Sequence, residues 1–311
     1  MGRGWVGLIF FVLIAASARA SWDPDCPVSM RAQSPFARLA GLVPMLPLND
    51  PYAQVDALGA RLRTAAIYGR EDRQIITEPI YPYRSMGRVT WPGGHCSASL
   101  ISPCHIITAK HCMIDSSNQA RPVSALVFNP VGGVPATTNV VAGYVGDDSS
   151  RSGDFAILKL DSSIGSTLGF MRIQYEEPAS LENRKGFEAS GYSADIVEGT
   201  KLSSDPTAEF LKTPRNVIGL RSEGAHVVEY RADTFLGASG GPIWRKNSAG
   251  EAVLVGLISS ALTIQEPQTK KFVNYRAAAD DPRGGYAVTS SGFIKEAQDW
   301  MKRNRCTLDQ K

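Results

Sequence analysis

The sequence predicts an all-β fold, either a barrel or a sandwich, that ends in a single helix. From about residue 80 the chain shows short runs of Val, Ile, Leu and Tyr separated by Gly, Pro, Asn, Asp and Ser, which is typical of closely spaced strands. It shows no alternation of strands with long helical segments, which argues against a parallel α/β sheet. The expected strands are Ser97–Ile101, His105–Thr108, Ala125–Phe128, Asn139–Val145, Phe155–Leu160, Val217–Arg221, His226–Tyr230, Val253–Ile258 and Phe272–Tyr275.

The expected helix covers Ser291–Arg303. Its apolar residues recur at the spacing that places them on one face of a helix. They are Phe293, Ile294, Ala297, Trp300 and Met301. A helix with one apolar face packs that face onto the strands.

Composition excludes several classes of protein. The chain has 311 residues, of which 43% are hydrophobic, enough for one large core or two small ones. Basic and acidic residues number 33 and 30, a net charge of +3. This balance gives no support for a nucleic-acid partner. A single long apolar run at the N-terminus argues against a multi-pass membrane protein.

That run predicts a secretory signal peptide at residues 1–20. Val6–Ala16 is apolar, follows the basic Arg3 and leads into the small residues around Arg19, as signal peptides do. The alternative is a membrane anchor, but the run is shorter than the ~20 residues that span a bilayer. We therefore expect a secreted protein, periplasmic if the source is Gram-negative, with no membrane contact in its mature form.

Residues 21–65 are expected to form a propeptide. They are rich in proline, and Arg61-Leu62-Arg63 offers a site for a protease near their end. The alternative is an N-terminal extension that stays attached.

The five cysteines are expected to form disulfides, because secretion exposes them to an oxidising compartment. They are Cys26, Cys96, Cys104, Cys112 and Cys306. The competing interpretation is a zinc site built from His95, Cys96, His105, His111 and Cys112. The spacing lacks a CxxC pair, so we expect no metal and no cofactor.

Three short stretches carry residues for nucleophilic catalysis. Ser239 lies between glycines in Gly237–Pro242, where backbone N–H groups can converge on an oxyanion. A serine hydroxyl needs a base, and His111 is the best placed of the four histidines because it follows a strand and precedes Cys112. Asp154 begins an apolar strand and can orient such a base.

In chain order these residues read His, Asp, Ser, and the sequence around each resembles the trypsin/chymotrypsin-like serine peptidases. The G-x-S-x-G motif at Ser239 also fits α/β-hydrolases, but those enzymes need a histidine after the serine, and none follows here. The resemblance implies two packed six-stranded antiparallel β-barrels with a C-terminal helix. It places the barrels at 66–175 and 176–290 and the helix and tail at 291–311.

The resemblance also implies roles for individual residues. The oxyanion donors would be the N–H groups of Gly237 and Ser239. Ser259 would lie beside the buried aspartate and, with Asp233 and Thr234, would belong to the substrate-binding residues. Cys96 would pair with Cys112. With Cys26 removed in the propeptide, Cys104–Cys306 would be the remaining bridge; alternatively, Cys26 holds the propeptide on.

Upstream residues resemble the bacterial glutamyl-endopeptidase (V8-like) branch. They are Tyr68–Arg73 and Tyr81-Pro82-Tyr83. Thr234 matches a threonine that this branch places around the substrate side chain. The branch also places a histidine in the strand after the nucleophile, whereas here that strand, Gly256–Ser260, has none.

Asp233 favours a different substrate side chain. It lies six residues before Ser239, where trypsin-like enzymes carry an aspartate at the base of the primary pocket. A carboxylate there would attract Arg or Lys and repel Glu. Ala238 occupies the position where trypsin-like zymogens use an aspartate to bind the new N-terminus, so activation must differ.

We therefore expect a secreted, monomeric serine endopeptidase that prefers Arg or Lys at P1. Its expected partners are protein or peptide substrates and its own propeptide. The alternatives are glutamyl specificity and a non-catalytic binding module on the same scaffold.

Overall fold

The computed structural model describes residues 66–115, 119–133, 137–147, 151–211, 225–260, 264–265, 272–273, 275–277 and 284–306. The expected signal peptide, the propeptide with Cys26, the expected strand Val217–Arg221 and residues 307–311 lie outside this part of the chain. No helix within the described ranges is long and apolar enough to cross a membrane.

The first barrel closes in the order β3-β4-β5-β8-β7-β6, and all of its pairs are antiparallel. Its strands are β3 (Met86–Trp91), β4 (Gly94–Leu100), β5 (His105–Thr108), β6 (Val127–Pro130), β7 (Thr138–Val145) and β8 (Ala156–Leu160). Alternate side chains such as Val89, Phe128 and Leu158 fill its interior. The expected strand Ala125–Phe128 begins two residues late because η3 (Val123–Ala125) takes its start.

The second barrel closes in the order β10-β13-β14-β18-β12-β11, since β11 also pairs with β10. Its strands are β10 (Phe187–Gly191), β11 (Ser203–Phe210), β12 (Val227–Arg231), β13 (Pro242–Lys246), β14 (Ala252–Ser260) and β18 (Gly285–Thr289). Central β14 is buried over eight consecutive residues, as its continuous apolar run predicts. The fold therefore confirms two six-stranded antiparallel barrels.

Short strands attach to this second barrel or pair with one another. β2 (Gln74–Ile75) pairs with β11, and β9 (Arg172–Ile173) pairs in parallel with β14. Both strands lie before residue 176, yet both pair with strands of the second barrel. The chain therefore contacts the second barrel before it forms the first barrel and again after it. Two further pairs are β1 (Ala66–Tyr68) with β17 (Tyr275–Ala277), and β15 (Ile264–Gln265) with β16 (Phe272–Val273). The expected strand Phe272–Tyr275 is thus divided between β16 and β17.

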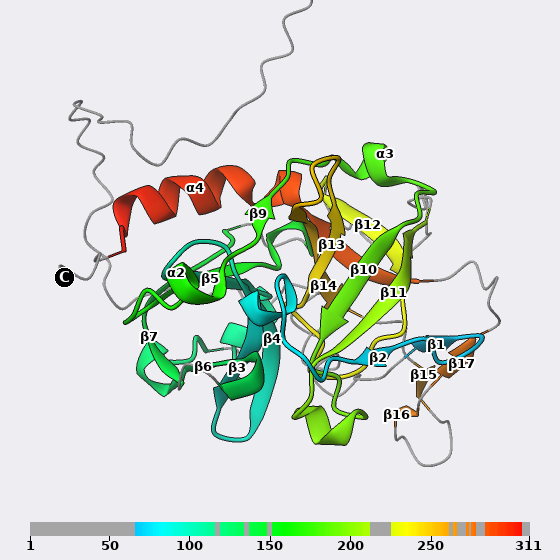
Figure 1. The fold of residues 1–311 in the computed structure, drawn as a ribbon, viewed down its shortest axis with the longest axis horizontal. Helices are drawn as coiled ribbons and strands as arrows, with labels where there is room; N and C mark the ends of the chain where they lie inside the picture. The colour runs from blue at the N-terminus through cyan, green and yellow to red at the C-terminus, as the bar shows by residue number, and fades with distance from the viewer. Residues whose placement is uncertain are drawn as a thin grey trace, which may run out of the picture. The chain divides into compact units, whose positions relative to one another are not determined.

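Few helices accompany the strands in the described ranges. The α-helices there are α2 (Gly165–Leu168), α3 (Pro178–Leu181) and α4 (Ile294–Arg303). Single 3₁₀ turns are η1 (Tyr83–Ser85), η2 (Lys110–Met113), η4 (Val131–Gly133), η5 (Arg151–Gly153), η6 (Val197–Gly199) and η7 (Ser290–Gly292). α4 confirms the expected C-terminal helix, drawn in red in Figure 1. Its Ala297 and Trp300 are buried.

The two barrels share one continuous apolar cluster. Ile107 and Phe155 of the first barrel contact a cluster that includes Trp244 and Leu257 of the second, and Phe293 beside α4 joins them. Figure 1 shows the barrels packed beside each other. The residues that follow β5 and those that precede β8 consequently meet Ser259 of β14 between the barrels.

Candidate active site

His111 lies in a short turn directly after β5. Ala109 keeps an extended backbone, the chain then turns through η2, and the Cys112 N–H donates to the Ala109 carbonyl at 3.2 Å. The Cys96–Cys112 disulfide ties the turn back to β4. The His111 side chain, which is 42% exposed, is thereby held at a fixed place at the end of β5.

Asp154 reaches His111 because β8 pairs with β5. Ala156 lies opposite Thr108 in that antiparallel pair, so the residues before β8 and after β5 come together. The Asp154 carboxylate accepts the His111 backbone N–H at 2.9 Å. It also accepts the ring Nδ1–H, at 3.1 Å to Oδ1 and 2.9 Å to Oδ2. With its proton fixed on Nδ1, the neutral ring leaves Nε2 as a proton acceptor.

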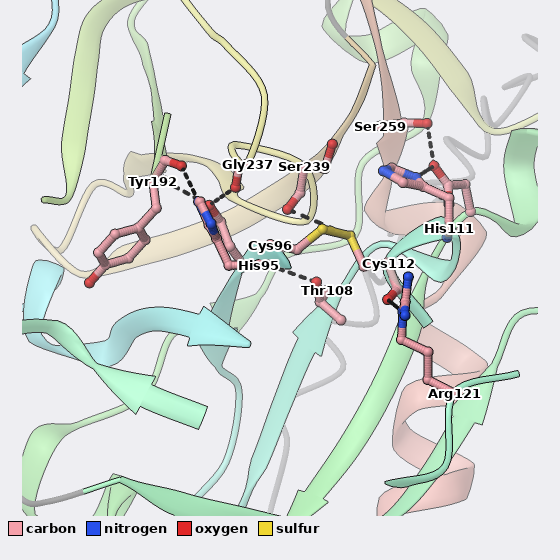
Figure 2. Close-up of a disulfide and its surroundings, with 12 residues drawn as sticks. His95, Cys96, Thr108, His111, Cys112, Arg121, Tyr192, Gly237, Ser239 and Ser259 are labelled. Atoms are coloured by element: carbon pink, nitrogen blue, oxygen red, sulfur yellow. Dashed lines mark hydrogen bonds and ion pairs between the residues drawn. A yellow bond between two sulfur atoms is a disulfide. The ribbon is translucent and has the colours of Figure 1, made fainter. Parts of the chain in front are cut away.

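The Asp154 carboxylate is held in its ionised form. Burial alone would raise the pKa of Asp154, but the His111 ring beside it and the hydrogen bonds from His111 and Ser259 outweigh burial and hold this pKa well below its usual range. The Ser259 hydroxyl donates to Oδ2 at 2.5 Å, as the resemblance implied. Ser259 belongs to β14, so this bond joins the two barrels at the site (Figure 2).

Ser239 lies in a loop that packs against the end of β5. A Cβ atom at Gly240 would lie 2.2 Å from the Thr108 hydroxyl oxygen and 2.6 Å from the Ala109 nitrogen, so glycine is required there. The Ser239 carbonyl accepts the Ser97 N–H at 2.9 Å. The same carbonyl lies 4.0 Å from the Cys112 sulfur. These contacts bring the Ser239 loop to the His111 turn, around the disulfide in Figure 2.

The backbone beside Ser239 offers two N–H groups. The Leu236 carbonyl accepts the Ala194 N–H at 2.6 Å. Because a trans peptide directs N–H opposite to C=O, the Gly237 N–H points away from that contact. Gly237 has a φ of +87°, a conformation that glycine tolerates. No acceptor within the described residues pairs with the N–H of Gly237 or Ser239.

Both carboxylate oxygens of Asp233 already have hydrogen-bond donors. Its side chain is buried, with 3% of the residue exposed, and its two oxygens accept the backbone N–H groups of Tyr68 at 2.8 Å and Asp72 at 3.0 Å. Both donors come from the segment before β2, more than 160 residues away in the chain. Asp233 therefore binds that segment and does not present an open carboxylate to a substrate cation.

Desolvation by burial raises the pKa of Asp233 to about 6, and the nearby charges of Asp205 and Glu71 act in the same direction. The two N–H donors oppose this shift. Asp205 also accepts the Asp233 backbone N–H at 2.6 Å. The two acids thus form a cluster satisfied by main-chain donors.

Thr234, the other expected contact of the substrate side chain, is buried as well. Its hydroxyl lies 3.2 Å from the Tyr230 hydroxyl, so the side chain already has a polar partner.

Both expected disulfides are present. Cys96 bonds to Cys112, and Cys104 bonds to Cys306. Within the described residues, two His–Cys clusters have the geometry for metal binding: Cys96 with His111 and Cys112, and Cys104 with His105 and Cys306. Each holds one of these disulfides, so its sulfurs are not thiolate ligands.

Sequence reasoning missed two residues that support the serine loop. The Ser97 hydroxyl donates to the Gly237 carbonyl at 2.7 Å and accepts the Tyr192 N–H at 2.8 Å. His95 Nε2 lies 2.9 Å from the Tyr192 carbonyl oxygen. A histidine and a serine on either side of Cys96 carry no motif of their own, and their partners are more than 90 residues away.

This arrangement has the components of acyl transfer. It combines a histidine oriented by a carboxylate, a serine loop packed beside it and two N–H donors next to the serine.

Comparisons with known proteins agree with this geometry. The Trypsin family model matches residues 75–279. The chain is 26% identical over 196 residues to a glutamyl endopeptidase of Bacillus licheniformis; the match covers 59% of this chain and 56% of the relative. It therefore spans little more than half of that relative's length.

Solved structures share the fold. A Glu endopeptidase in complex with MPD matches with a TM-score of 0.55 and 21% identity, over 76% of this chain and 99% of the other. The protease Anisep from Arthrobacter nicotinovorans matches with a TM-score of 0.53 and 16% identity, over 73% and 98%. At these identities the likeness concerns the architecture.

The family match covers more than half of the chain and contains His111, Asp154 and Ser239 in order. Together with the double barrel, it shows that this chain belongs to the trypsin family.

Proposed function

We propose that this protein is a serine endopeptidase that works through an acyl-enzyme. The observation that carries the proposal is the joined site: His111 bonded through Nδ1 to Asp154, beside a serine loop with two N–H groups that lack an acceptor among the described residues.

The proposed reaction proceeds in two halves. Ser239 Oγ attacks the scissile carbonyl carbon while His111 Nε2 takes the hydroxyl proton. The carbonyl oxygen becomes an oxyanion that accepts the N–H groups of Gly237 and Ser239. His111 returns the proton to the departing amine, and water then releases the acyl group by the same steps. Asp154 remains ionised throughout and stabilises the imidazolium.

Labelling with a fluorophosphonate tests this activity. We expect one adduct, mapped to Ser239, that disappears in Ser239→Ala. Ser102→Ala is the matched control, since Ser102 also bonds a histidine but is buried. If the folded protein forms no adduct with or without residues 1–65, the proposal fails and the non-catalytic binding module replaces it.

For the substrate, we propose glutamate at P1. Two observations support glutamate over Arg or Lys. The B. licheniformis relative is a glutamyl endopeptidase, and the Asp233 carboxylate accepts two main-chain N–H groups while 3% exposed. The strand Gly256–Ser260 counts against glutamate, because it lacks the histidine that the glutamyl branch places in the strand after the nucleophile.

Peptides that differ at P1 alone decide this point. We expect kcat/KM to be highest for Glu, lower for its neutral isostere Gln, and lower still for Arg, Lys and Phe. Faster cleavage after Arg or Lys than after Glu would restore the preference expected from Asp233.

We further propose that the protein is exported and loses residues 1–65 in two steps. Two disulfides support an oxidising destination. The mass and N-terminal residue of the protein recovered from outside the cytoplasm measure both cleavages. A cytoplasmic protein with reduced cysteines would contradict export. Loss of residues 21–65 from Ser239→Ala purified alone would show that the removal does not need this protein's own activity.

A further inference from the structure

We propose that residues Tyr68–Arg73, here called the strap, position the Gly237 N–H for catalysis by holding Asp233 and Asp195. The inference rests on the proposed endopeptidase activity. The strap would order the loop that carries Ser239. Ala238 has no charge and cannot order this loop through an ion pair.

The strap's first hold is on Asp233. Tyr68 N–H and Asp72 N–H donate to its two carboxylate oxygens at 2.8 and 3.0 Å. Hydrogen bonds to a charged acceptor are stronger than neutral ones, and a buried carboxylate that loses its donors is costly. Asp233 lies six residues before Ser239, so the strap fixes the chain where it enters the serine loop.

The second hold is an ion pair to Asp195. The Arg73 guanidinium donates to both Asp195 oxygens, at 2.9 and 2.7 Å, and to both Glu71 oxygens, each at 2.7 Å. Its side chain is 3% exposed. Two parallel bonds from a planar group fix orientation as well as distance, so Arg73 sets the position of the Asp195 segment.

The Asp195 segment in turn contacts the serine loop. Ala194, the residue before Asp195, donates its N–H to the Leu236 carbonyl at 2.6 Å. That carbonyl and the Gly237 N–H belong to one planar peptide. A shift of Asp195 that breaks the Ala194 bond frees this peptide to rotate.

Gly237 makes such a rotation inexpensive. Its φ of +87° lies in a region open to glycine, which reaches several other conformations with little strain. Ala238 has a buried methyl group and no charge to anchor the loop. External contacts must therefore select the productive orientation, and the strap supplies two of them.

Substitutions at the ends of the ion pair test the proposal. The variants are Arg73→Ala, Asp195→Asn and the two combined. Lys295→Ala is the control, because Lys295 forms an exposed ion pair with Asp299 on α4. Since loss of one oxyanion donor lowers kcat by about 10²–10³-fold, we expect kcat to fall about 10- to 100-fold for each variant. We expect KM to change less than threefold. The kcat of the double variant should equal that of the single variant with the lower kcat.

A second readout separates positioning from general damage. A peptide boronate forms a tetrahedral adduct with Ser239, whereas a product peptide does not. We expect boronate affinity to fall by the same factor as kcat while product affinity stays unchanged. Amide exchange of residues 192–196 and 234–240 should also be faster in Arg73→Ala, a measurement that does not depend on catalysis.

Several results would overturn the role of the strap. They are wild-type kcat in folded Arg73→Ala and Asp195→Asn, equal losses of boronate and product affinity, and unchanged amide exchange. If wild type itself neither cleaves nor labels, the proposed function fails, and amide exchange still decides whether the strap orders the loop.

Discussion

Two of the three histidines that neighbour a disulfide cysteine, His105 and His111, lie in very different surroundings. His111 precedes Cys112, and His105 follows Cys104. A serine hydroxyl belongs to each surrounding network. The Ser102 hydroxyl lies 2.6 Å from His105 Nδ1, whereas the Ser259 hydroxyl donates to the aspartate that holds His111.

The remaining partners differ. His105 Nε2 donates to the Asn304 carbonyl at 2.9 Å, which leaves Nδ1 to accept from Ser102. The residue is 2% exposed. Burial lowers the pKa of His105 to about 4, and the charge of Lys159 adds to this shift. His111 instead bonds a carboxylate through Nδ1, and its side chain is 42% exposed.

The difference shows that a serine–histidine hydrogen bond does not by itself make a nucleophile. A buried imidazole with a low pKa is a weak base at neutral pH, and both of its nitrogens are occupied. His105 therefore anchors the end of α4 through Asn304. His111 has the orienting carboxylate that catalysis needs, on a side chain that is partly exposed.

The largest expected effect separates the two histidine sites by activity. Asp154→Asn should lower kcat about 10⁴-fold, since the amide no longer fixes the Nδ1 proton or stabilises the imidazolium. Ser102→Ala should leave kcat within twofold. Steady-state kinetics on one peptide substrate measure both variants, and a loss below tenfold in Asp154→Asn would contradict the assignment.

Removing each disulfide should affect the two histidine sites differently. Replacing Cys104 and Cys306 with serine removes a bridge between residues 202 positions apart. The free energy of unfolding should fall by about 2–5 kcal/mol, with kcat unchanged while the protein stays folded. Replacing Cys96 and Cys112 should lower kcat too, because that bridge holds the His111 turn. Urea unfolding and kinetics test this, and wild-type kcat in the second pair would argue against it.

The buried histidine should appear in the pH dependence of stability. Its folded pKa of about 4 lies below the ordinary value of ~6.5. The unfolded chain therefore takes up the proton first as pH falls, and His105 costs stability progressively between pH 6.5 and 4, by at most about 3 kcal/mol. In His105→Leu, Tm should start lower but decline less over this range. An identical decline in both proteins would refute the account.

The smallest expected effect concerns the bond between the barrels. Ser259→Ala removes one donor from Asp154, while the two His111 donors remain. A hydrogen bond to a charged group contributes about 1.5–3 kcal/mol, so kcat should fall about tenfold. Ser290→Ala, on a hydroxyl that bonds Gln174 away from the site, is the control. No change in Ser259→Ala would mean that the serine only packs.

The sequence predicts the fold where apolar patterning is strong. β5, β8, β14 and α4 have continuous apolar runs or stripes and were expected nearly in place. β10 and β11 were not expected, because buried polar groups occupy part of their inner surface. Ser190 and Ser204 bond each other at 2.7 Å, a contact that no single strand displays.

For the candidate active site too, the sequence predicts local motifs but not contacts between remote residues. Each motif around His111, Asp154 and Ser239 is local, so each could be found by sequence alone. Asp233 was also found, but its partners Tyr68 and Asp72 were not, because they are remote in the chain. A local motif can be recognised in the sequence, whereas the donors that bond to a carboxylate depend on the folded structure.

The most direct measurement is the site and extent of fluorophosphonate labelling in wild type and Asp154→Asn, read by peptide mass mapping. We predict a single adduct on Ser239, formed far more slowly in Asp154→Asn, and none on Ser102. An adduct on another serine, or equal labelling rates in the two proteins, would contradict it.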